Sequence, residues 1–181
     1  MSARFVLLLI LVALIGAGGG FAFHQWLTAP PAPLAEAPRS PQAPETRPDF
    51  HLPDLSGNMR SADEWDGQVV LVNFWATWCP PCVREIPELV RLQELHHENG
   101  LVVLGIAIDE PEAVEAFLAD MAVNYPILLG RQGGIALAQE FGNRHGILPY
   151  TVVYDRNGRI THTHAGELDL KAAETMVLPL L

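Results

Sequence analysis

Cysteine is scarce in this sequence. Only two of the 181 residues are cysteines, Cys79 and Cys82, and two prolines separate them within the stretch NFWATWCPPCVREIPEL. A structural metal site built from cysteines normally has four ligands, and the chain has no second cysteine pair to complete one. What remains to be explained is which chemistry needs one close pair of thiols and no other.

Basic residues are also few. Lys and Arg number 11 against 21 Asp and Glu, and from Asp49 onward the balance is 8 against 19. Phosphate binding needs a basic surface, so this composition argues against nucleic acid as a partner. The acidic surface favours solubility, and it could also steer a positively charged protein partner.

Charged residues are absent from Phe5 to Phe23, an apolar run of 19 residues. About 20 apolar residues span a bilayer as a helix. A cleaved signal peptide is the alternative, but its apolar core is normally roughly 7 to 15 residues long, and no clean Ala-x-Ala site follows Phe23. We expect residues 1–27 to form an uncleaved single-pass signal anchor with its amino terminus in the cytoplasm, with Trp26 at the membrane interface.

Large apolar side chains are nearly missing from residues 28–48, which are rich in Pro and Ala. Such a segment cannot bury enough surface to fold, and proline-rich chains extend by about 3.1 Å per residue. We predict a linker here, either a stalk or a connector without a spacing role. The folded domain is expected over residues 49–181.

The apolar patterns of this domain predict an α/β fold. Strands are predicted at 68–76, 101–109 and 125–130, and two more, with alternating side chains, flank the Asn157-Gly158 turn within 150–166. Helices are predicted at 80–97, 111–122, 134–141 and 168–178. Strands and helices in this order predict a central mixed sheet with helices on both faces.

The cysteine pair lies between the first of these strands and the first helix. Unpaired N–H groups and the helix dipole favour an anion at a helix start, and thiols in Cys-x-x-Cys sites have pKa values lowered from about 8.5 to roughly 3.5 to 7.5. Cys79 is therefore predicted to be partly thiolate at neutral pH and to attack disulfides. Cys82, one turn away, would resolve the mixed disulfide.

Two other interpretations of the pair remain open. A structural disulfide would close a very short loop and gain little entropy from it. The dithiol could instead bind a soft ion such as Cu(I). Histidines are the possible further ligands, although surface positions explain them as well: His96, His97, His145, His162 and His164.

The stretches FWATWCPPC and GILPYTVVYDRNG, with Pro87 in the helix, resemble the thioredoxin superfamily. The resemblance is to its membrane-anchored TlpA/ResA/DsbE(CcmG)-like branch and covers roughly residues 48–166. It implies a thioredoxin-like fold with an extra helix and strand inserted before a cis-proline loop at Leu148-Pro149.

The same resemblance implies roles for single residues. Cys79 would be the exposed nucleophile, Cys82 the buried resolving thiol and Trp78 an aromatic side chain that shields the pair. Pro149 would pack against the disulfide, in a loop that offers backbone groups to an extended substrate.

Two further positions concern proton transfer. Asn73 stands six residues before Cys79, where thioredoxin has a buried Asp. Glu85 matches an acidic residue that the ResA-like branch places close to its thiols. We expect a partly buried Glu85 to tune the thiol pKa values or to deprotonate Cys82; an exposed helix carboxylate without such a role is the alternative.

The resemblance implies a thiol-disulfide oxidoreductase without a prosthetic group, tethered to the bacterial inner membrane with its domain in the periplasm or on the outer face. We expect a reductant of protein disulfides, such as those of apo-cytochrome c or copper-assembly proteins, that takes electrons from a membrane thiol donor. A general oxidant and a copper-binding chaperone that uses the dithiol as a ligand are the alternatives.

Overall fold

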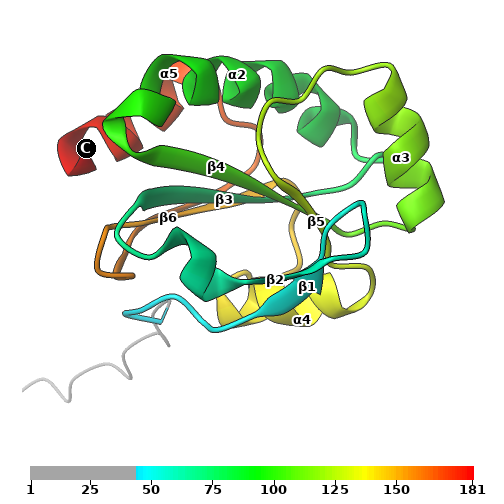
Figure 1. The fold of residues 1–181 in the computed structure, drawn as a ribbon, viewed down its shortest axis with the longest axis horizontal. Helices are drawn as coiled ribbons and strands as arrows, with labels where there is room; N and C mark the ends of the chain where they lie inside the picture. The colour runs from blue at the N-terminus through cyan, green and yellow to red at the C-terminus, as the bar shows by residue number, and fades with distance from the viewer. Residues whose placement is uncertain (1–43) are drawn as a thin grey trace, which may run out of the picture. The chain divides into compact units, whose positions relative to one another are not determined.

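The computed structural model describes residues 44–181, which fold around a five-stranded mixed sheet (Figure 1). Its strands, in chain order, are β3 (Val69–Trp75), β4 (Leu101–Ala107), β5 (Ile127–Leu129), β6 (Tyr150–Tyr154) and β7 (Ile160–Ala165). In space the order is β5-β4-β3-β6-β7; β3, β4 and β5 are parallel, and β6 and β7 join antiparallel. The predicted strands and the mixed sheet are confirmed.

Helices cover both faces of this sheet, as predicted. They are α2 (Pro80–His96), α3 (Pro111–Ala119), α4 (Gly133–Glu140) and α5 (Leu170–Val177), with short 3-10 turns η1 (Ala62–Trp65), η2 (His97–Asn99) and η3 (Leu178–Leu180). Figure 1 shows α2 and α5 on one face and α4 on the other. Helix α2 runs through Pro87 without a break, and α3 ends before the predicted residue 122.

Strand β3 divides the core into two clusters because its side chains alternate between the two faces. One cluster lies beneath α2, α3 and α5 and includes Val69, Leu71 and Trp75. The other lies on the α4 side and includes Val70, Val72 and Phe74 together with Phe141. The alternation places Asn73, between Leu71 and Trp75, on the face covered by α2.

The hairpin of β6 and β7 forms as predicted around Asn157-Gly158, but its strands do not show the predicted alternation of buried and exposed side chains. Every residue of β6 is buried because β6 lies between β3 and β7. Strand β7 forms the edge of the sheet and is partly exposed. The prediction of two alternating strands is therefore wrong: β6 is buried throughout, and exposure along β7 does not alternate from one residue to the next.

A small hairpin of β1 (His51–Pro53) and β2 (Met59–Ser61) was not predicted. It lies on the α4 side of the sheet, where Asp54 forms an isolated bridge with Leu128 of β5 (Figure 1). The rings of Phe50 and Trp65 stack at a centroid distance of 6.2 Å, and both residues belong to the core cluster on the α4 side of the sheet.

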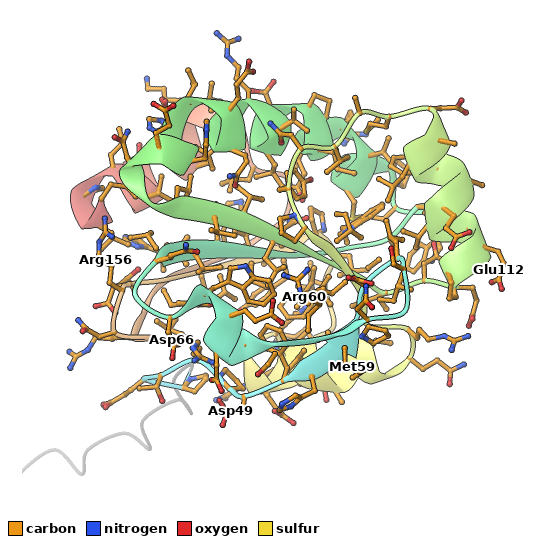
Figure 2. The ribbon with its side chains drawn as sticks, viewed as in Figure 1. Asp49, Met59, Arg60, Asp66, Glu112 and Arg156 are labelled. Atoms are coloured by element: carbon orange, nitrogen blue, oxygen red, sulfur yellow. A yellow bond between two sulfur atoms is a disulfide. The ribbon has the colours of Figure 1, made fainter. Side chains whose placement is uncertain are left out.

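Residues 45–47, assigned above to the linker, belong to the folded domain. The Arg47 N–H donates to the Gly158 carbonyl at 2.8 Å, and the Ile160 N–H donates to the Glu45 carbonyl at 3.0 Å. The Arg47 guanidinium also donates to Asp66 at 2.6 Å; Asp66 and Asp49 are labelled beside this segment in Figure 2. The predicted boundary at residue 48 is therefore a few residues too late.

The predicted anchor and residues 28–43 of the predicted linker lie outside the described residues. Within residues 44–181, none of the helices combines the length and the apolar character needed to cross a bilayer.

Candidate active site

The two cysteines form a disulfide at the start of α2. Their Cα atoms are 5.3 Å apart. Cys79 is the N-cap residue of the helix, and its Sγ accepts a hydrogen bond from the Cys82 N–H at 3.3 Å. The predicted position of Cys79 at the helix start is thus confirmed, and a backbone donor already points at the sulfur that would carry negative charge.

The two prolines limit how many donors reach that sulfur. Pro80 and Pro81 occupy the first two helical positions and have no N–H group. The Val83 N–H donates instead to the Cys79 carbonyl at 3.1 Å. Of the first three helical residues, only Cys82 can therefore offer a backbone N–H to the Cys79 sulfur.

Cys79 is less accessible than expected. Its exposed fraction is 5%, and that of Cys82 is 0%. The prediction of a buried Cys82 is confirmed, but the description of Cys79 as exposed is wrong for the disulfide form, because both sulfurs pack in the same cluster as Ile86 and Leu89. A partner must reach Cys79 through the small area that remains open.

Trp78, directly before Cys79 in the chain, and Leu148, directly before Pro149, line a common apolar hollow. The Leu148-Pro149 peptide bond is cis, as expected. Trp78 is 66% exposed and lines, with Leu148 and Ile135, a hollow of about 80 Å³. Shielding of the disulfide by Trp78 stays a prediction, as does the role of Pro149. Ile135, an exposed residue of α4, was not anticipated as part of this surface.

Glu85 is buried, which rules out the alternative of an exposed helix carboxylate. Its exposed fraction is 1%. Asn73 Nδ2 donates to Glu85 Oε1 at 2.7 Å, and the Leu168 N–H donates to Oε2 at 2.9 Å. Burial raises the pKa of Glu85 from 4.5 to about 7; the two hydrogen bonds act in the opposite direction, and the nearby charge of Glu167 adds to the rise.

A carboxyl group with a pKa near 7 is suited to general acid-base chemistry at neutral pH. Glu85 lies one turn after Cys82 on the same helix, the spacing that puts two side chains on one face. The sequence indicated the residue, but not its partner Leu168, which lies far along the chain.

Three of the histidines named as possible metal ligands lie on other elements than the cysteines or at the far end of α2. His96 contacts Glu174 of α5 at 3.1 Å, and His162 and His164 lie on the edge strand β7. Within residues 44–181, no group of three or more His, Cys, Asp or Glu side chains is arranged to hold a metal ion.

Comparison with known proteins agrees with this geometry. Residues 42–177 match the Redoxin family. The chain is 34% identical to thiol-disulfide oxidoreductase ResA of Geobacillus kaustophilus over 124 residues, 68% of this chain and 69% of that protein. It is 30% identical to ResA of Halalkalibacterium halodurans over 172 residues, 94% of this chain and 92% of that protein.

Solved structures show the same fold. A thiol:disulfide interchange protein of the thioredoxin family from Chlorobium tepidum superposes with a TM-score of 0.67 and 26% identity, covering 77% of this chain and 97% of that one. A secreted thiol-disulfide isomerase from Corynebacterium glutamicum gives a TM-score of 0.68 at 26% identity, with 74% and 83% covered. The chain therefore belongs to the Redoxin family of the thioredoxin superfamily and is a thiol-disulfide oxidoreductase of the ResA type.

Proposed function

We propose that this chain is a membrane-tethered reductase of partner disulfides, held on the outer face of a bacterial inner membrane. The apolar run from Phe5 to Phe23 and the proline-rich segment after it support the tether. The similarity to the Halalkalibacterium protein also supports it, because its coverage of 94% of this chain extends beyond the folded domain.

The reaction needs only the two thiols and a proton acceptor. The Cys79 thiolate attacks one sulfur of a partner disulfide; that disulfide breaks, and its second sulfur leaves as a thiolate. Cys82 then loses its proton, and its thiolate attacks Cys79 Sγ. The bond between Cys79 and the partner breaks, the partner's first sulfur leaves as a thiolate, and the Cys79–Cys82 disulfide forms, so that two electrons pass to the partner. The two partner thiolates become a dithiol by taking up two protons, equal in number to those that Cys79 and Cys82 lost.

The observation that carries this mechanism is the position of Cys79 Sγ, which accepts the Cys82 N–H at the start of α2. A sulfur in this position is stabilised as the thiolate, which is both the attacking group and the better leaving group. Glu85, buried one turn beyond Cys82, is the group that we assign as acceptor of the Cys82 proton.

The substrates that we propose are disulfides in apo-cytochrome c or in copper-assembly proteins, with a membrane thiol donor returning electrons to Cys79 and Cys82. This assignment depends on the resemblance to the membrane-anchored branch. The direction of electron flow is chosen because an oxidising compartment already contains strong oxidants, so that a tethered and selective protein is more useful there as a reductant.

Three measurements on the full chain test the proposal: two in detergent, and one, the trapping of partners, in cells. Cys79→Ser should abolish reduction of insulin disulfides, while Cys82→Ala should accumulate mixed disulfides through Cys79 and allow the partners to be identified. The reduction potential of the pair should lie near that of thioredoxin, about −270 mV. Full activity of Cys79→Ser would refute the mechanism, and a potential near about −120 mV, that of a strong oxidant, would reverse the proposed direction.

A further inference from the structure

Asn73 is the buried side chain that faces Glu85 from the sheet. Its Nδ2 donates to Glu85 Oε1 at 2.7 Å and to Thr151 Oγ1 at 3.2 Å. Thr151 is the residue directly opposite Asn73 in the pairing of β3 with β6. Asn73 and Thr151 are both 0% exposed and Glu85 is 1% exposed, so water does not compete for these contacts.

The recorded orientation suits an ionised Glu85. Asn73 Nδ2 donates to one carboxylate oxygen and the Leu168 N–H donates to the other. A proton placed along either contact would face a donor instead of an acceptor. The neutral acid therefore needs a different partner orientation from the carboxylate.

Asn73 can supply that second orientation. Among residues 44–181, Asn73 Oδ1 is buried and has no hydrogen-bond partner. A half turn of the amide exchanges its oxygen and nitrogen within nearly the same volume. Oδ1 would then accept the O–H of protonated Glu85, and the Thr151 hydroxyl, which accepts in the first orientation, would donate in the second.

We propose that Asn73 is a positioning residue whose amide turns with the protonation state of Glu85, donating to the carboxylate and accepting from the acid. This inference builds on the proposed function, in which Glu85 takes the proton of Cys82. When Cys82 becomes a thiolate its proton moves to Glu85, Asn73 turns, and the acid keeps a hydrogen-bond partner in the core.

The second hydrogen-bond partner of the Glu85 carboxyl, the Leu168 backbone N–H, can only donate and does not offer this choice. Cys79 and Cys82 lie on its own helix. Burial and, to a smaller extent, the charge of Glu85 raise the pKa of Tyr125, which lies in the segment before β5. Glu167 raises the pKa of Glu85 through its negative charge, and it also pairs with Arg84 at 2.6 Å. An Asp at position 73 would place a second carboxyl group against Glu85, and two like charges so close cannot both ionise readily. Asn provides the hydrogen bond without the second charge.

The test uses the full chain in detergent, isotopically labelled and in the disulfide form, in which the two cysteines do not titrate. NMR follows the Glu85 carboxyl carbon and the Asn73 side-chain amide as the pH changes. Both should move with one midpoint near pH 7, and the Asn73 signals should become constant in Glu85→Gln. The buried amide of Asn143, which contacts the Ile147 backbone at 2.8 Å, is the internal control and should stay constant. Asn73 signals that do not change while Glu85 titrates would overturn the proposal.

A variant adds a second readout. Asn73→Leu should raise the pKa of Glu85 by about one unit, a tenfold change in proton affinity, because the bond to the charged form is the stronger one. The pH profile of the resolving step should shift by the same amount, but not in the Glu85→Gln background. Gln93→Met removes a partly buried amide elsewhere on α2, and it should leave the pKa of Glu85 and the pH profile of the resolving step unchanged.

An unchanged Glu85 titration in folded Asn73→Leu would contradict the proposal. If Asn73→Leu does not fold, the titration of the unaltered chain decides. The titration of the unaltered chain involves no turnover. If Asn73 and Glu85 titrate together in a protein that lacks reductase activity, the result would count against the proposed function and not against the role of Asn73.

Discussion

The Leu168 N–H donates to Glu85 Oε2 at 2.9 Å, although the two residues are 83 positions apart. This bond connects α2 to the segment that precedes α5, and it joins the buried carboxyl group to a residue of the core cluster that also contains both cysteines. Burial raises the pKa of Glu85, and the two hydrogen bonds reverse only part of this rise, so the pKa is about 7.

That raised pKa predicts how stability depends on pH. The folded state holds the Glu85 proton up to about pH 7, whereas the unfolded chain releases it near 4.5. The stabilisation is therefore complete below pH 4.5 and is lost as the pH rises through 7, a decrease on the order of 3 kcal/mol in the free energy of unfolding. Denaturant unfolding of the disulfide form at pH 5 and pH 8 should show this decrease, and Glu85→Gln should lack it. An equal decrease in both proteins would assign it to other groups.

Glu85 should also affect the thiols of the reduced chain. Its negative charge, one turn from Cys82, opposes a second negative charge there, so Glu85→Gln should lower the pKa of Cys82. The two thiols must be titrated together because neighbouring groups titrate as a pair. Glu94→Gln, which removes the same charge from an exposed position on α2, is the matched control. Identical thiol titrations in Glu85→Gln and the unaltered chain would remove Glu85 from the mechanism.

Pro81 limits the stabilisation of the Cys79 thiolate because it has no N–H at the second helical position. Pro81→Ala would restore one donor at the helix start. We expect the pKa of Cys79 to fall by roughly half a unit, since charge interactions at a helix terminus contribute about 0.3 to 1 kcal/mol. Alkylation rates measured against pH would detect this, and a higher pKa in the variant would contradict the explanation.

Arg47 connects the first described segment to the rest of the domain. Its side chain is only 11% exposed and pairs with Asp66 at 2.6 Å and Asp63 at 3.1 Å. Arg47→Ala should lower the free energy of unfolding by about 1 to 2 kcal/mol, through lost packing as well as lost charge. Arg91→Ala, at an exposed position on α2, should change it by less than about 0.5 kcal/mol. Similar stabilities of the two variants would mean that residues 45–47 contribute little to the folded domain.

The regular elements could be predicted because their patterns are local. Val69–Trp75 and Leu101–Ala107 are long apolar runs, α2 has a helical repeat, and Asn157-Gly158 defines a turn. The hairpin of β1 and β2 has only three residues in each strand, too few to show a period. Its position depends on a bridge between Asp54 and Leu128, which no local pattern records.

In the site, too, features with a local sequence pattern could be predicted, and features that depend on distant contacts could not. The Cys-x-x-Cys spacing and the strand before it were sufficient to place Cys79 at a helix start. The burial of Glu85 and its bond to Leu168 depend on how α5 returns to α2, and the role of Arg47 depends on Asp63 and Asp66, which fold back against it. Contacts between distant segments determine these features, so the sequence suggested Glu85 but not its environment.

The most direct measurement is the pH dependence of Cys79 alkylation in the reduced full chain. The hydrogen bond from the Cys82 N–H and the helix start should hold the pKa of Cys79 clearly below the value of about 8.5 for an ordinary thiol, and Cys79 should react before Cys82 at neutral pH. A Cys79 that titrates near 8.5 or above, or that reacts more slowly than Cys82, would contradict the assignment of Cys79 as the nucleophile.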